Sequence, residues 1–191
     1  TLLDEVEERD SLEVGMDSLD LKIMSLELKS LLDSFHYEEY LNCVNPLWGP
    51  QDVLYLPTYH PFTSYVDYTS YTVRLEAISH YIDTHVELLR EAVDNGRAQP
   101  CVALTGVTEQ LYDAGRGPAT EHPLYSPYAS SSSSSSGYIL QEDDPLRRRG
   151  EEAISSYIIP AFQRLISYWE SEYLKSCRDT VSRIDTSENP F

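Results

Sequence analysis

The sequence lacks the local motifs by which many enzymes are recognised. None of its five histidines is followed by glutamate, so the zinc-binding helix pattern HExxH is absent. No GxSxG, phosphate-binding loop or GxGxxG pattern occurs either. The residues alone therefore predict a helical scaffold without catalytic or metal-binding residues of its own.

Basic residues and long apolar runs are also scarce. The 191 residues include 14 Lys and Arg against 32 Asp and Glu, which gives a net charge of −18. A nucleic-acid partner is excluded, because binding phosphates requires a basic surface. No run of about 18 apolar residues exists, which excludes a membrane-spanning helix. Such acidity usually serves solubility, and cation binding by clustered carboxylates is the alternative.

Cysteine is rare, and its spacing matches no common zinc site. Cys43, Cys101 and Cys177 are far apart in the sequence. They could be buried thiols that pack as small apolar side chains. One disulfide with a free or interchain third cysteine is the alternative if the protein is secreted. The chain starts at Thr1 without an initiator Met or a signal peptide, so we expect a processed or trimmed product.

Apolar residues recur at helical spacing, and strand patterns are absent. A first helix is expected from residue 17, and Asn45-Pro46 should stop it. The second starts at a capping box of Ser64 and Asp67 and ends, about 30 residues later, at Asn95-Gly96. These long amphipathic helices predict an all-α fold with proline-rich connectors.

Two more helices are expected, one on each side of a long loop. Pro100 suits the first turn of the third helix, and Pro160 should kink the last one. The loop between these helices contains the run Ser130–Ser136, which is typical of a flexible linker. The basic run Arg147–Arg149 is expected to be a solvated helical turn. A processing-protease site and an acid-binding contact are the alternatives.

One folded domain is expected for a chain of this length. Along the sequence we distinguish four regions. They are an acidic lead-in (1–16), a helical region (17–115) with a proline-rich connector (45–62), a serine-rich loop (116–144), and a kinked C-terminal helix with its tail (145–191).

The connector Asn45–Phe62 reads NPLWGPQDVLYLPTYHPF. Its prolines exclude a regular helix, and its apolar side chains are too many to be left in water. We therefore expect it to pack against a partner, which is expected to be larger than this chain. The residues predicted to line a cleft or an interchain contact are Trp48, Tyr55, Tyr59, His60, Phe62 and Arg74.

Three segments resemble, in the correct order, the N-terminal half of the domain of unknown function 885 family (DUF885). The connector supplies Asn45-Pro46-Leu47, Leu56-Pro57 and His60-Pro61-Phe62. The second helix and its end supply Tyr71, Arg74-Leu75, Gly96 and Gln99-Pro100. The last helix supplies Ile159-Pro160-Ala161, Leu165, Glu172-Tyr173-Leu174 and Arg178. The serine-rich loop departs from the family pattern.

This family is similar to helical zinc metallopeptidases, and its presumed metal motif lies in the C-terminal half. The resemblance implies that this chain is a non-catalytic N-terminal chain or fragment of a metal-dependent hydrolase, forming one wall of the cleft. Zinc and the catalytic groups would belong to the C-terminal half, as a separate chain of a hetero-oligomer or as a missing segment. Members are often secreted or lipid-anchored, which implies an extracellular or cell-envelope location. The alternative is a structural or assembly protein that reuses the fold without activity.

Overall fold

The computed structural model describes residues 2, 4–5, 16–129 and 138–179. The all-α prediction is confirmed: the described residues form helices and turns, with no strand beyond one isolated bridge between Pro100 and Arg178. The chain divides into two compact units, residues 1–41 and 42–191. Most of the acidic lead-in and the serine run lie outside the described residues.

The first unit contains helix α2, Met16–His36, and the 3-10 turn Glu39–Leu41. The prediction that this helix continues to Asn45-Pro46 is wrong. It ends earlier because Glu38 adopts a left-handed conformation, with φ of 56°, which an α-helix cannot continue through. Large apolar side chains of α2 remain exposed, and Phe35 is 73% exposed.

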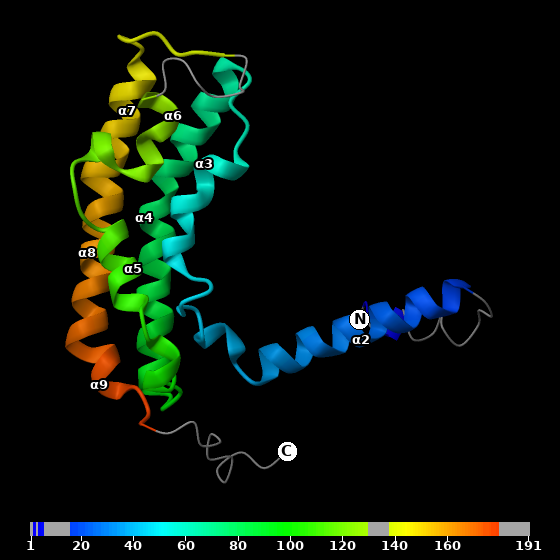
Figure 1. The fold of residues 1–191 in the computed structure, drawn as a ribbon. Helices are drawn as coiled ribbons and strands as arrows, with labels where there is room; N and C mark the ends of the chain where they lie inside the picture. Colours follow the sequence, from blue (N-terminus) through cyan, green and yellow to red (C-terminus); the bar gives the residue numbers. More distant parts are fainter. Residues whose placement is uncertain (1, 3, 6–15, 130–137, 180–191) are drawn as a thin grey trace. The chain divides into compact units, whose positions relative to one another are not determined.

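The second unit is built on helix α4, Tyr65–Asp94, which packs along a helical rod from the C-terminal part of the chain (Figure 1). The rod consists of α7 (Pro145–Ala153), a π segment (Ile154–Ile158), α8 (Ile159–Tyr168), a second π segment (Trp169–Tyr173) and α9 (Leu174–Ser176). Helix α5, Val107–Ala114, packs against α8. Shorter elements are η2 (Pro50–Tyr55), α3 (Leu56–Tyr59), η3 (Cys101–Leu104), η4 (Ala119–Glu121), η5 (Pro123–Tyr125) and α6 (Ser126–Ala129).

Helix α4 has the start and the end that its sequence predicts. The Ser64 hydroxyl accepts a hydrogen bond from the Asp67 amide at 3.3 Å, and the Asp67 carboxylate accepts one from the Ser64 amide at 2.8 Å. Hydrogen bonds to this carboxylate from the Thr63 side chain, and then from Ser64 and the Thr63 amide, lower the pKa of Asp67. At the other end Gly96 takes a left-handed conformation with φ of 67°. Its apolar stripe is buried over most of its length, at Tyr68, Tyr71, Leu75, Ile78, Ile82 and Leu89, and Val93 at its end is half-buried.

The third helix starts later than predicted. Pro100 is extended rather than helical, and it is followed by the short 3-10 turn Cys101–Leu104. Gly106, with φ of 87°, then redirects the chain, so that α5 begins only at Val107. The disturbance expected at Pro160 takes the form of a wider turn, in which the Ile159 amide bonds to the carbonyl of Ile154.

A buried histidine connects α5 to the turn that follows it. His122 is 4% exposed, and its Nε2 lies 3.1 Å from the carbonyl oxygen of Ala114. Its Nδ1 accepts a hydrogen bond from the Leu124 amide at 3.3 Å, which requires the neutral ring. Burial lowers the pKa of His122 below its ordinary value of 6.5.

This histidine should make the unfolding free energy depend on pH. The unfolded chain takes up the proton near the ordinary pKa of 6.5, whereas the folded chain does so only at a lower pH. The contribution is therefore complete above pH 6.5 and is lost as the pH falls toward the folded-state pKa. Urea unfolding at a series of pH values should show this decline, and His122→Gln should flatten it. Identical profiles for the two proteins would contradict the assignment.

Candidate functional site

An amide network fixes the connector to α5. The Nε2 of Gln51 donates to the carbonyl of Asn45 at 2.7 Å and to Oε1 of Gln110 at 3.3 Å. Gln110 in turn donates to the carbonyl of Pro46 at 3.2 Å. The Oε1 atom of Gln51 is buried and has no hydrogen-bond partner among the described residues. The connector is therefore held by the Gln110 side chain of α5 and by its own Gln51, and is rigid where it passes α5.

The same network leaves large side chains of the connector facing outward. Asn45 Oδ1 accepts hydrogen bonds from the amides of Leu47 and Trp48 at 2.8 and 3.2 Å, which closes a tight turn. We call the four exposed side chains the connector surface; they are Leu47 (80% exposed), Trp48 (56%), Tyr55 (58%) and Tyr59 (82%). A hollow of about 220 Å³ adjoins Leu47 and Tyr55. Rigid apolar side chains exposed in this number are typical of an interaction site.

The end of the connector turns inward. His60 is buried, with Nε2 at 2.8 Å from the carbonyl oxygen of Asp67. Its ring packs against Phe62 and Tyr71, with centroids 5.0 and 5.3 Å away. Of the residues predicted to line a cleft, His60 and Phe62 thus belong to the packing of this unit. Arg74, on α4, is exposed like Trp48, Tyr55 and Tyr59.

Other residues that carry the family resemblance meet where the rod ends. Gln99 donates from Nε2 to the carbonyl of Val44 at 2.8 Å, and its amide donates to the Tyr173 hydroxyl at 3.3 Å. The Arg178 amide donates to the carbonyl of Gln99 at 3.1 Å, and its guanidinium donates to that of Ala98 at 2.9 Å. These motif residues hold three distant segments together. Their role is structural.

A disulfide between Cys101 and Cys177 closes the same region. The alternative of one disulfide and a third cysteine is therefore confirmed. Cys43 is free, and its Sγ lies 4.0 Å from the carbonyl oxygen of His85. Burial raises the pKa of Cys43 to about 12, so that the reactive thiolate is scarce at neutral pH.

We expect no reactive thiol in the native, oxidised protein. Without denaturant, a disulfide-exchange reagent at pH 8 should titrate essentially no thiol. In roughly 8 M urea, which unfolds most small domains, it should titrate one equivalent, because Cys43 is then exposed. The variant Cys43→Ser serves as the control and should give no signal in either condition. Rapid labelling of the folded wild type would contradict the raised pKa of the half-buried Cys43.

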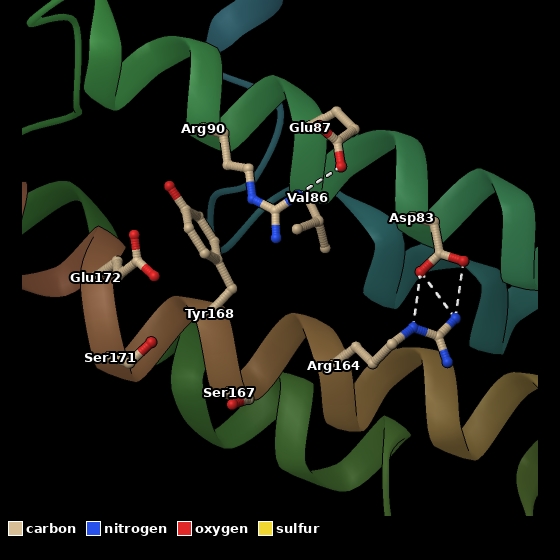
Figure 2. A pocket seen from close by; sticks show the side chains of 9 residues that line it. All are labelled: Asp83, Val86, Glu87, Arg90, Arg164, Ser167, Tyr168, Ser171 and Glu172. Atoms are coloured by element: carbon tan, nitrogen blue, oxygen red, sulfur yellow. Dashed lines mark hydrogen bonds and ion pairs between the residues drawn. The ribbon is translucent and has the colours of Figure 1, made fainter.

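A polar groove of about 510 Å³ lies between α4 and the C-terminal part of the rod (Figure 2). Arg164 makes a two-pronged ion pair with Asp83, with N–O distances of 3.1 and 2.7 Å. Arg90 pairs with Glu87 at 2.6 Å, and its guanidinium lies 5.2 Å from the ring centre of Tyr168. Both guanidinium groups are thus engaged within the protein. We interpret the groove as a contact between two helices that these ion pairs stabilise.

The basic run is solvated in part, since Arg148 and Arg149 are exposed and Arg147 is half-buried. Arg148 is exposed, as predicted. Arg149 makes the acid-binding contact, since it pairs with Glu76 on α4 at 2.5 and 2.8 Å. Arg147 donates to the backbone carbonyls of Tyr128, Leu140 and Gln141, the last two at 2.8 and 2.7 Å. It thereby joins the two sides of the serine-rich loop.

Two further searches of the described residues give negative results. No group of three or more His, Cys, Asp or Glu side chains in this part of the chain is arranged to hold a metal ion. None of the helices described there combines the length and apolar character that a membrane span needs.

The fold and its contacts define an all-α scaffold with a rigid connector that presents apolar side chains. The chain belongs to the family described as "Bacterial protein of unknown function (DUF885)", whose model matches residues 1–189. The family resemblance predicted from the three motifs is thereby confirmed, over more of the chain than those motifs cover. No curated protein and no solved structure shows significant similarity to the sequence.

Proposed function

We propose that this chain is the non-catalytic N-terminal part of a metal-dependent, peptidase-like hydrolase and forms one wall of its substrate cleft. The observation that carries this proposal is the connector surface. Leu47 and Trp48 are held outward by Asn45, and the contact of Gln51 with α5 fixes the backbone behind them. Preorganised apolar groups of this kind favour binding of another protein segment, because little conformational entropy is lost.

The proposed partner is the catalytic C-terminal region of the same protein, as a separate chain or as a continuation of one polypeptide. The resemblance to helical zinc metallopeptidases implies the chemistry: a zinc ion held by the catalytic region would activate water and polarise the scissile carbonyl. The connector surface of this chain would cover the cleft and exclude water from it. The Cys101–Cys177 disulfide favours a location outside the cell or in the cell envelope.

Introducing charge on the connector surface tests this proposal. In the whole protein, Trp48→Asp combined with Tyr59→Asp should weaken association with the catalytic region about 10- to 100-fold, because exposed apolar anchors contribute most of the energy at interfaces. Native co-purification, or limited proteolysis for a single polypeptide, measures the effect. Tyr157→Asp, at an aromatic residue 48% exposed on the rod, is the matched control.

The proposed hydrolysis can be tested separately from the interface, in the wild-type assembly. Zinc content by elemental analysis and hydrolysis of a peptide library should both be positive. An assembly with neither zinc nor peptide hydrolysis would refute the proposed hydrolase function and favour the structural alternative. If the double variant associates as tightly as the wild type, the connector surface is not part of the interface.

A further inference from the structure

Two buried side-chain atoms in the described part of the chain have no hydrogen-bond partner among its residues, and both belong to the connector. They are Oε1 of Gln51 and Nδ1 of His60. Burial without a partner costs such a group about 1–3 kcal/mol, because the hydrogen bonds that water would supply are lost. The packed connector therefore loses stability at two atoms that an opened connector would expose to water.

The ring of His60 lies where the connector meets α4. The residue is 7% exposed, and its Nε2 donates to the carbonyl of Asp67 at 2.8 Å. Because a carbonyl oxygen can only accept, Nε2 carries the proton, and Nδ1 of the neutral ring is an acceptor. Phe62 and Tyr71 pack on the ring. Protonation would add a second N–H, for which the described residues provide no acceptor.

The ionisable groups around His60 offer little compensation for a positive charge on its ring. On α4 the Asp67 carboxylate already accepts several hydrogen bonds at the start of the helix. Tyr71 uses its hydroxyl in a hydrogen bond to a backbone carbonyl at 2.8 Å, and burial raises its pKa, so that it stays neutral. Element η5, which packs against α3, adds Tyr125, whose pKa burial also raises. On the connector itself, Tyr59 is exposed.

We propose that His60 is an acid-sensitive anchor of the connector: the neutral ring holds the end of the connector against α4, and protonation at Nδ1 releases it. An opened connector exposes both ring nitrogens to water, so it takes up the proton more readily than the closed form. The closed form is therefore favoured at high pH. It is lost as the pH falls through the range, about 8 to 5, in which histidine side chains ordinarily become charged.

The anchor affects the connector surface through the residue beside it. Tyr59 belongs to this surface and is 82% exposed, and it directly precedes His60 in the sequence. Release of His60 would let the backbone of Tyr59 move. Acid should therefore weaken binding of a partner to the connector surface. This consequence rests on the proposed function, whereas the anchor itself does not.

Hydrogen exchange of the whole protein tests the anchor. In the closed form the His60 amide donates to the carbonyl of Leu56 at 3.1 Å, and the Thr63 amide donates to the Asp67 carboxylate at 2.9 Å. Their protection factors, corrected for the intrinsic effect of pH, should fall about 10-fold from about pH 7.5 to about pH 5.5. In His60→Gln they should stay nearly constant, because the amide side chain can donate to Asp67 but cannot become charged.

The difference between the wild type and His60→Gln isolates this histidine, because both proteins retain His122. His80→Gln, at an exposed histidine of α4, is the matched control and should keep the wild-type profile. Equal profiles for the wild type and His60→Gln would overturn the proposal.

Nitrogen NMR of the wild type decides the question if His60→Gln does not fold. A ring that gains its second proton only as its contacts with Phe62 and Tyr71 are lost would support the proposal. A doubly protonated ring that keeps these contacts would overturn it. An ordered water bonded to Nδ1 in a crystal structure would do the same, because it gives the added proton an acceptor.

The anchor and the proposed function can fail separately. If acid releases the connector but Trp48→Asp with Tyr59→Asp leaves association unchanged, the interface is refuted and the anchor stands. If association depends on these two residues but the protection factors are the same at both pH values, the anchor is refuted and the interface stands.

Discussion

Replacing Cys101 and Cys177 together by serine should lower the free energy of unfolding by about 4 kcal/mol. The two cysteines are 76 residues apart, and a cross-link over so long a segment removes much of the entropy of the unfolded chain. The native geometry should survive, because the Cys101 amide still donates to the carbonyl of Arg178 at 2.9 Å. Urea unfolding of the oxidised wild type and of the double variant measures the difference.

The remaining cysteine supplies a control for this experiment. Cys43→Ser keeps the disulfide and should cost far less than the double variant, because the two side chains are similar in size. Reducing the wild type with dithiothreitol should reproduce the stability of the double variant. A difference below about 1 kcal/mol between oxidised and reduced protein would show that the disulfide does not restrain the unfolded chain.

The variant Arg147→Ala should destabilise the second unit by about 3 kcal/mol. One guanidinium serves three carbonyl groups, those of Tyr128, Leu140 and Gln141, and hydrogen bonds from a charged donor each contribute about 1.5–3 kcal/mol at most. The sum is reduced because the carbonyls can partly rehydrate. Hydrogen exchange of the amides around residue 140 should also accelerate, since the two sides of the loop are no longer joined.

The neighbouring arginine provides a matched comparison. Arg148→Ala changes the same charge on an exposed side chain and should alter stability by no more than about 0.5 kcal/mol. Arg147→Lys should recover only part of the loss, because a single ammonium group lacks the planar fork that reaches several carbonyls. Equal effects of Arg147→Ala and Arg148→Ala would indicate a general charge effect.

Elements with local signals could be predicted from the sequence. Helix α4 has a capping box, a regular apolar stripe and an Asn-Gly end, and all three depend on neighbouring residues. The end of α2 could not be predicted, because Glu38 adopts a conformation more often taken by glycine or asparagine. The late start of α5 depends on Gly106 and on the chain direction imposed at Cys101.

The candidate site could be predicted in composition but not in orientation. The prolines and apolar residues of the connector indicate a rigid, packed segment. Which side chains face outward depends on the contact between Gln51 and Gln110, residues 59 apart in the sequence. The pairing of Cys101 with Cys177 is non-local in the same way. The partner region stays a prediction.

The two π segments decide where the rod can change its length. A π turn takes in one residue more than an α turn, so removing one residue from it gives an ordinary α turn and leaves the faces downstream in nearly the same orientation. A deletion within Ile159–Tyr168, which is regular α-helix, would instead rotate everything downstream by about 100°. It would turn Trp169 out of the core and carry Cys177 away from Cys101. Single deletions should therefore be tolerated better in the π segments than in α8.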